Sequence, residues 1–146
     1  MQGRWKRLLP WVLVPLALYF VNVEWQTRRG ESALQATALT FRPLEVALSR
    51  ARSSGRPVLV DFSAIWCPAC RRLHEQVFTD PAVRAALEAG YELSLVDYES
   101  PEAPAFMRRY AVTGFPTLLV LDAEGRLLRR LPIRDEPAAF VRDLEG

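Results

Sequence analysis

The feature that most constrains this chain is a pair of cysteines, two residues apart, at the end of an apolar run. The segment Val58–Phe62 is short and β-branched, with Asp61 as its one charge, which predicts a buried strand. The segment Arg71–Phe78, after the pair, carries apolar residues at helical spacing. We therefore expect Cys67 where the strand gives way to a helix, with Cys70 one turn further on.

This placement predicts redox chemistry. Unpaired N–H groups and the helix dipole at a helix N-terminus favour a thiolate over a thiol. A C-x-x-C pair in a strand–helix setting is typical of a thiol–disulfide redox site. The alternative is a static structural bridge, but a ring that closes only two intervening residues constrains the unfolded chain little. We expect Cys67 and Cys70 to form a redox disulfide.

Several residues around the pair resemble the thioredoxin family. Trp66 completes a W-C-x-x-C motif with Cys67 and Cys70. Asp61 falls where thioredoxins keep a buried acid on the strand before the motif. Far downstream, Gly114–Thr117 reads Gly-Phe-Pro-Thr and is similar to the family loop whose proline is cis and faces the cysteines.

Two further stretches narrow this resemblance. Gly55–Val58 and Phe78–Val83 look like the C-terminal thioredoxin-like domain of thiol:disulfide interchange proteins of the DsbD family, and like their small membrane-anchored relatives. The resemblance covers roughly residues 40–146. It implies an α/β thioredoxin-like fold in which a mixed central sheet is flanked by helices.

The resemblance also implies roles for individual residues. Cys67, exposed at the helix start, would attack a substrate disulfide, and Cys70 would resolve the mixed disulfide. Asp61 could pass a proton to Cys70, although it could also be a partly solvated residue at a strand end. Phe115 would offer backbone groups to a bound peptide beside Pro116. We expect no cofactor.

Trp66 is expected to pack beside the cysteines and shape the surface on which a substrate docks. His74, four residues after Cys70, shares a helix face with it. One alternative is therefore a copper- or zinc-binding delivery module that uses Cys67, Cys70 and His74. We assign no metal ligands, and otherwise expect His74 to be a solvated helix residue.

The N-terminus predicts a membrane anchor. A basic head precedes Leu8–Val23, a run of sixteen uncharged residues, short for a spanning helix, and aromatic residues occur at both ends of it. A cleaved signal peptide and a buried soluble helix are the alternatives. We expect a signal anchor over residues 1–25, a polar tether over 26–40 and the thioredoxin-like domain over 41–146.

Charge indicates the orientation and excludes one class of partner. The positive residues before the run slightly outnumber those after it, which favours a cytoplasmic N-terminus in a bacterial inner membrane and a domain facing the periplasm or exterior. The net charge is only +2, and the residues after the run are nearly neutral. Because nucleic-acid binding needs a basic face, we expect no such partner.

The remaining pattern predicts alternating elements, with helices over 43–54, 81–89, 101–110 and 136–144 and strands over 91–97, 117–121 and 126–131. Taken together, the sequence predicts a membrane-tethered thiol–disulfide oxidoreductase outside the cytoplasm that reduces protein disulfides and is recharged by a membrane thiol-electron donor. A reductant for apocytochrome c in cytochrome c biogenesis and a disulfide oxidase are its nearest alternatives.

Overall fold

The computed structural model describes residues 3–146, and it describes side chains from residue 11 onward. The elements follow one another in the order α1 (Gly3–Ala36), α2 (Leu44–Ser54), β1 (Val58–Ser63), α3 (Pro68–Leu73), the π-helical turn η1 (His74–Phe78), α4 (Pro81–Gly90), β2 (Glu92–Asp97), α5 (Ala103–Tyr110), β3 (Thr117–Leu121), β4 (Leu127–Leu131) and α6 (Pro137–Glu145). The predicted helices and strands after residue 43 are all present.

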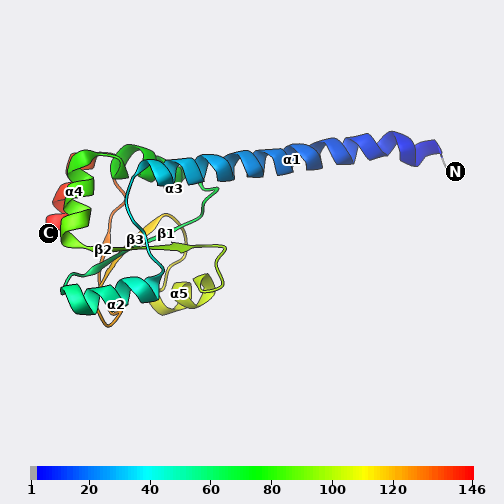
Figure 1. The fold of residues 1–146 in the computed structure, drawn as a ribbon. Helices are drawn as coiled ribbons and strands as arrows, with labels where there is room; N and C mark the ends of the chain where they lie inside the picture. Colours follow the sequence, from blue (N-terminus) through cyan, green and yellow to red (C-terminus); the bar gives the residue numbers. More distant parts are fainter. Residues whose placement is uncertain (1–2) are drawn as a thin grey trace.

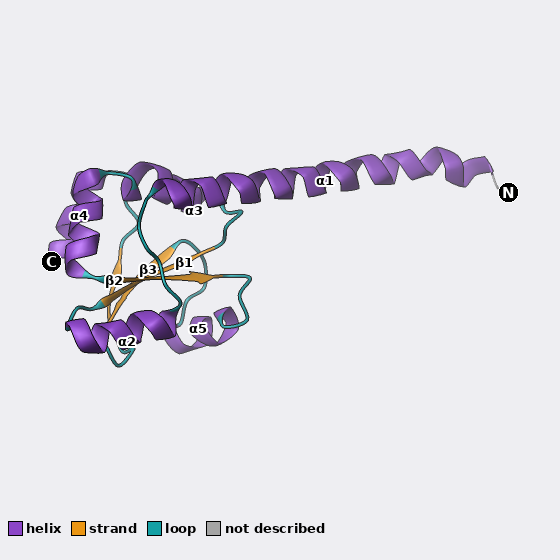
Figure 2. Cartoon of the chain, viewed as in Figure 1, coloured by secondary structure: helices purple, strands orange, loops and turns teal. Residues whose placement is uncertain are grey.

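The four strands form one mixed sheet in the order β2-β1-β3-β4. β1 pairs parallel to β2 and antiparallel to β3, and β3 pairs antiparallel to β4. Helices lie on both sides of this sheet (Figure 2), so β1 at its centre is buried at every residue. The α/β thioredoxin-like architecture expected from the sequence is confirmed.

Alternation along β1 divides its side chains between the two faces of the sheet. Val58, Val60 and Phe62 join a cluster with residues of α2 and α5. Leu59 points the other way, into the cluster formed with α3, η1, α4 and α6. Asp61 has the same parity as Leu59. The pleat therefore directs its carboxylate toward the helix that carries the cysteines.

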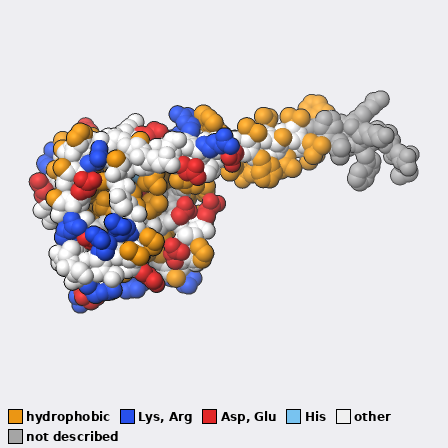
Figure 3. Space-filling model, in the orientation of Figure 1, with side chains coloured by type: hydrophobic (Ala, Val, Ile, Leu, Met, Phe, Trp, Pro, Cys, Tyr) orange, Lys and Arg blue, Asp and Glu red, His pale blue; other side chains and the backbone are white. Residues whose placement is uncertain are grey.

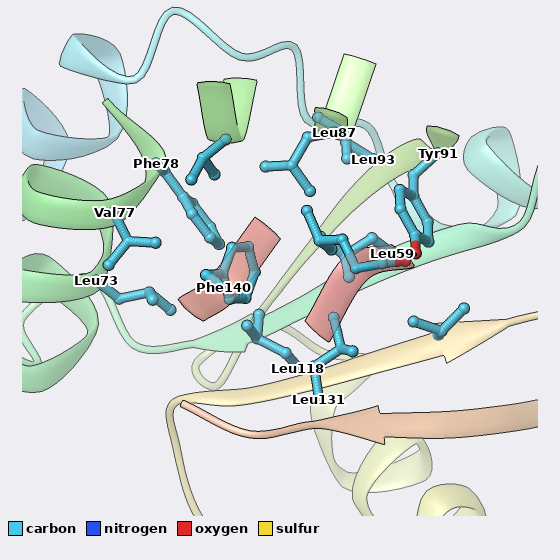
Figure 4. Close-up of a cluster of buried hydrophobic side chains, with 13 residues drawn as sticks. Leu59, Leu73, Val77, Phe78, Leu87, Tyr91, Leu93, Leu118, Leu131 and Phe140 are labelled. Carbon is cyan, nitrogen blue, oxygen red and sulfur yellow. Dashed lines mark hydrogen bonds between the residues drawn. The ribbon is translucent and has the colours of Figure 1, made fainter. Parts of the chain in front are cut away.

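The larger cluster holds that helix against the sheet (Figure 4). Phe78 lies with its ring centroid 5.7 Å from that of Phe140, so the end of η1 is packed against α6. Leu73, at the end of α3, and Val77, in η1, pack in the same cluster. Burial of several large apolar side chains fixes α3 and η1 on the sheet, each side chain contributing about 1.5–3 kcal/mol.

The N-terminal segment differs from the sequence prediction. Residues 26–36, expected to be a polar tether, continue α1, and the helix ends beside α3 (Figure 1). Thr37 is buried and its hydroxyl donates to the carbonyl of Leu34 at 2.7 Å. The polar composition of this segment did not indicate that it is helical or that one face of it is buried against the domain, and its role as a tether stays a prediction.

The first part of α1 projects from the domain, and hydrophobic side chains surround it on the face shown in Figure 3. Within the described residues, no helix combines the length and apolarity needed to cross a membrane. Leu8–Pro10, which begin the apolar run, lie outside the residues whose side chains are described.

A buried ion cluster ties the start of β2 to the segment around α2. Glu92 is 4% exposed, and its carboxylate accepts hydrogen bonds from Arg50, at 2.9 Å, and from Arg56. Burial alone would raise the pKa of Glu92, but the two guanidinium groups outweigh it and lower that pKa from 4.5 to about 2.

We predict that Glu92→Gln lowers the free energy of unfolding at pH 7 by about 2 kcal/mol, because it removes a charged partner of two arginines. Since folding lowers the pKa of Glu92, its stabilising effect is full above pH 4.5 and is lost as the pH falls toward 2. Urea unfolding of both proteins between pH 2 and pH 7 measures this. A stability difference that does not change with pH would contradict it.

Candidate redox site

Cys67 occupies the N-cap of α3. Its backbone is extended, and its Sγ accepts a hydrogen bond from the backbone N–H of Cys70 at 3.2 Å. Pro68 follows at the first helical position, where its missing N–H costs nothing. The loop after β1 therefore places the Cys67 sulfur at the start of a helix, where it accepts a backbone N–H.

Both cysteines are free thiols in this structure and both are largely covered. Cys67 is 5% exposed, less than the sequence prediction of an exposed nucleophile implied, and Cys70 is 1% exposed. Burial is the main cause that raises the pKa of Cys70 from 9.0 to about 12, and the hydrogen bond with Cys67 adds to it. Cys70 is therefore a protonated thiol at neutral pH.

Asp61 is fully buried and has two side-chain partners. Its Oδ2 lies 2.6 Å from Nε2 of His74, and its Oδ1 accepts a hydrogen bond from the hydroxyl of Ser63. The alternative of a partly solvated Asp61 is thereby excluded. Burial of a carboxylate costs free energy unless it has hydrogen-bonding partners, and His74 and Ser63 supply these partners to Asp61.

The prediction that His74 is solvated was wrong, since it is 3% exposed. Its ring also stacks on Phe78, with the centroids 5.5 Å apart. The buried face of α3 and η1 consists of Cys70, Leu73, His74, Val77 and Phe78. The helical spacing of these residues is visible in the sequence. It was the signal that could have predicted His74 to lie against the sheet and not in solvent.

His74 does not join the cysteines as a metal ligand. Its Nε2 is directed at Asp61, and among the side chains of residues 11–146 no three His, Cys, Asp or Glu residues are grouped to hold a metal ion. The geometry therefore assigns His74 to the buried carboxylate and not to the ligand set that the sequence offered as an alternative.

Aromatic side chains cover the other side of the cysteines. Phe115 lies 5.5 Å from Trp66 and 5.0 Å from Tyr98, measured between ring centroids. Both Trp66 and Phe115 pack against the small cluster that contains the two cysteines. The Phe115–Pro116 peptide bond is cis, as the resemblance implied. Tyr98 is a member of this group that the sequence did not identify.

A family comparison agrees with this geometry. The profile of the Thioredoxin-like domain matches residues 44–139, most of the region after α1. The chain belongs to the thioredoxin-like family. With a Cys67–Cys70 pair at the N-terminus of α3, it has the redox motif of disulfide oxidoreductases in this fold.

Curated relatives place the chain more narrowly. It is 32% identical over 128 residues to the thiol:disulfide interchange protein DsbD of Salmonella paratyphi A, a match that covers 84% of this chain and 23% of that protein. It is 38% identical over 116 residues to DsbD 2 of Pseudomonas aeruginosa, covering 75% and 20% respectively. The chain thus spans about a fifth of these relatives.

Solved structures share the fold. A thioredoxin from Thermus thermophilus superposes with a TM-score of 0.65 at 33% identity, covering 73% of this chain and 85% of that one. The oxidised C-terminal domain of DsbD from Neisseria meningitidis gives a TM-score of 0.62 at 23% identity, covering 73% and 97%. The second likeness supports the fold alone.

The burial of Cys70 generates a prediction about its reactivity. A pKa of about 12 in place of 9.0 leaves about 1000-fold less thiolate at pH 8. A more basic thiolate is intrinsically more nucleophilic, so we expect alkylation roughly 30-fold slower than for an ordinary thiol. Iodoacetamide labelling of the reduced protein, resolved by peptide mass spectrometry, measures this rate.

The urea-unfolded protein is the control, because there Cys70 regains its ordinary pKa. In the folded protein the labelling rate should keep rising above pH 9 instead of levelling off. A rate that levels off near pH 9 would contradict the assignment of Cys70 as the strongly protonated thiol.

Proposed function

We propose that this chain is a thiol–disulfide oxidoreductase that reduces protein disulfides through Cys67 and Cys70. The observation that carries the proposal is the asymmetry of the pair. One sulfur caps a helix N-terminus, and the other is buried behind it as a protonated thiol. Such an arrangement separates an attacking group from a resolving group.

The reaction runs in two exchanges. The Cys67 thiolate attacks one sulfur of a substrate disulfide, forming a mixed disulfide and releasing the other substrate sulfur as a thiolate. Cys70 then loses its proton and attacks the Cys67 sulfur. The Cys67–Cys70 disulfide forms and the second substrate sulfur leaves. The substrate gains two electrons and two protons, and the chain is left oxidised.

The proton of Cys70 needs an acceptor in a buried site. Cys70, Ser63 and His74 line one small cavity of about 10 Å³, roughly the space for one water molecule. Both Ser63 and His74 contact Asp61. We propose that the Asp61–His74 pair accepts this proton, which extends the role suggested for Asp61 to a second residue.

The substrate would dock on the aromatic side of the site. Trp66, Phe115 and Pro116 are partly exposed beside the cysteines. We propose that Trp66 and Phe115 move to uncover Cys67, which is 5% exposed, and that the backbone of Phe115 pairs with the substrate chain.

Two single substitutions test the exchange. We predict that Cys70→Ser, incubated with a protein disulfide, accumulates a mixed disulfide through Cys67, because nothing resolves it. We predict that Cys67→Ser accumulates none, because Cys70 is buried and protonated. Non-reducing electrophoresis and mass spectrometry of the linked peptides report both results.

Serine keeps the size of each side chain, so the two variants control for one another. Trapping through Cys70 instead of Cys67 would overturn the assigned roles. Equilibration of the unsubstituted protein with glutathione then reports the direction. A potential near the −270 mV of thioredoxin supports a reductant, and one near −120 mV would make the protein an oxidant.

A reductant must be recharged, and both cysteines of the chain lie in the site itself. We propose that a membrane thiol carrier supplies the electrons, since the chain has no other cysteine to carry them. The apolar run Leu8–Val23 supports a membrane tether that leaves the domain outside the cytoplasm. Because α1 is continuous, Ala36 lies only about 16 Å along the helix from Trp25.

For the tether, we predict that the full chain expressed in bacteria stays with the membrane fraction after alkaline carbonate extraction and is released by detergent. The apolar side chains exposed on α1 would partition into the bilayer. Replacing Leu16 and Leu18, both on the projecting part, with aspartate should release the chain. Recovery of the unsubstituted chain in the carbonate supernatant would contradict the tether.

A further inference from the structure

One face of the second half of α1 is buried against the redox helix. The partly or fully buried positions recur at intervals of three and four, as in an amphipathic helix. They are Val23, Gln26, Thr27, Gly30, Ala33, Leu34 and Thr37. This helix face lies against α3 and η1, the elements that carry Cys70 and His74 (Figure 1).

The closest contact of this interface is made by Gly30. A Cβ atom at this position would lie 1.8 Å from the carbonyl oxygen of Ile65, so no side chain fits there. Ile65 belongs to the short loop that leads into Cys67, in which the N–H of Cys67 donates to the carbonyl of Ala64 at 2.9 Å. α1 therefore touches the loop that positions the first cysteine.

A polar contact holds the same interface from its other side. Gln26 Oε1 accepts a hydrogen bond of 2.6 Å from Arg71, the residue after Cys70. The Arg71 side chain is only 14% exposed, although it carries a charge. The Arg71 side chain is therefore directed to α1.

The cavity beside Cys70 completes the interface. Gly30 and Leu34 form its α1 wall, opposite Cys70, Ser63 and His74. Without α1, this side of the cavity would be open to solvent. The helix thus separates from water the residues that we propose to exchange the resolving proton.

We infer that residues 26–37, the second half of α1 with Thr37 directly after it, are a working part of the redox centre, which close the Cys70 side of the site to water and thereby set the reactivity of Cys70. Gly30 is the positioning residue, since its missing side chain permits the close approach. The inference deepens the proposed thiol–disulfide exchange and rests on it.

The charged and titratable groups around Cys70 explain what the loss of α1 would change. On the side of the site opposite α1, the titratable groups around Cys70 are Cys67, Asp61 and His74. The cavity is also lined by Arg71 and Asp97. α1 adds no charged group to that lining. Displacing α1 therefore admits water, which relieves the burial of the Cys70 thiol and shifts its alkylation profile to lower pH.

The test is Gly30→Ala in the full chain in detergent micelles. Alanine favours a helix more than glycine does, so any effect comes from the contact with Ile65. We expect iodoacetamide to label Cys70 at least tenfold faster at pH 8 than in the unsubstituted protein. The matched control is Gly90→Ala, where a new Cβ atom would meet nothing within 4 Å.

A second variant, Leu34→Ala, thins the cavity wall without a clash and should also accelerate the labelling. Glu92→Gln is a destabilised control away from α1. Unchanged labelling in both α1 variants would overturn the inference, and so would equal acceleration in Glu92→Gln. Alkylation needs no substrate, so a failure of this test is distinguished from a failure of the mixed-disulfide trapping.

Discussion

The hydrogen bond from the N–H of Cys70 to the sulfur of Cys67 is the contact on which the redox site depends. It exists because only a short loop separates the end of β1, a central strand, from the start of α3, with Cys67 as N-cap. The geometry gives the two thiols different environments although only two residues separate them. The Cys67 sulfur accepts a backbone N–H at a helix start, while burial raises the pKa of the Cys70 thiol.

The buried group of Asp61, Ser63 and His74 is the second constraint. An unpaired carboxylate at the centre of a sheet would cost several kcal/mol, and two hydrogen-bonding partners offset that cost. The pleat of β1 directs Asp61 and Ser63 toward α3. The helical spacing of the buried face of α3 and η1 directs His74 toward the same two residues. A titratable pair close to a protonated thiol can accept its proton directly or through one water molecule.

The two halves of the long N-terminal helix α1 lie in different surroundings. Its first half exposes apolar side chains, and its second half buries one face on α3 and η1. α1 is continuous from Gly3 to Ala36, so the exposed apolar half and the half packed on the redox site are parts of one element.

The order of the elements, the position of the cysteine pair and the family were predictable from the amino-acid sequence, because these follow from local patterns. The period of the apolar residues, the positions of the prolines and the spacing of the W-C-x-x-C motif are each defined over a short stretch of the chain. The sequence also indicated Asp61 and the Phe115–Pro116 loop, through resemblance. It did not indicate that residues 26–36 are helical, because a mildly polar helix and a polar linker have similar compositions.

The contacts of His74, Tyr98, Gly30 and Gln26 became visible only in the folded chain. His74 meets Asp61 from a different element, and Tyr98 meets Phe115 across the mouth of the site. Gly30 meets Ile65, thirty-five positions away in the chain. Such contacts depend on how the faces of separate elements are brought together, and the pattern of any one element specifies its own buried face but not the partner that covers it.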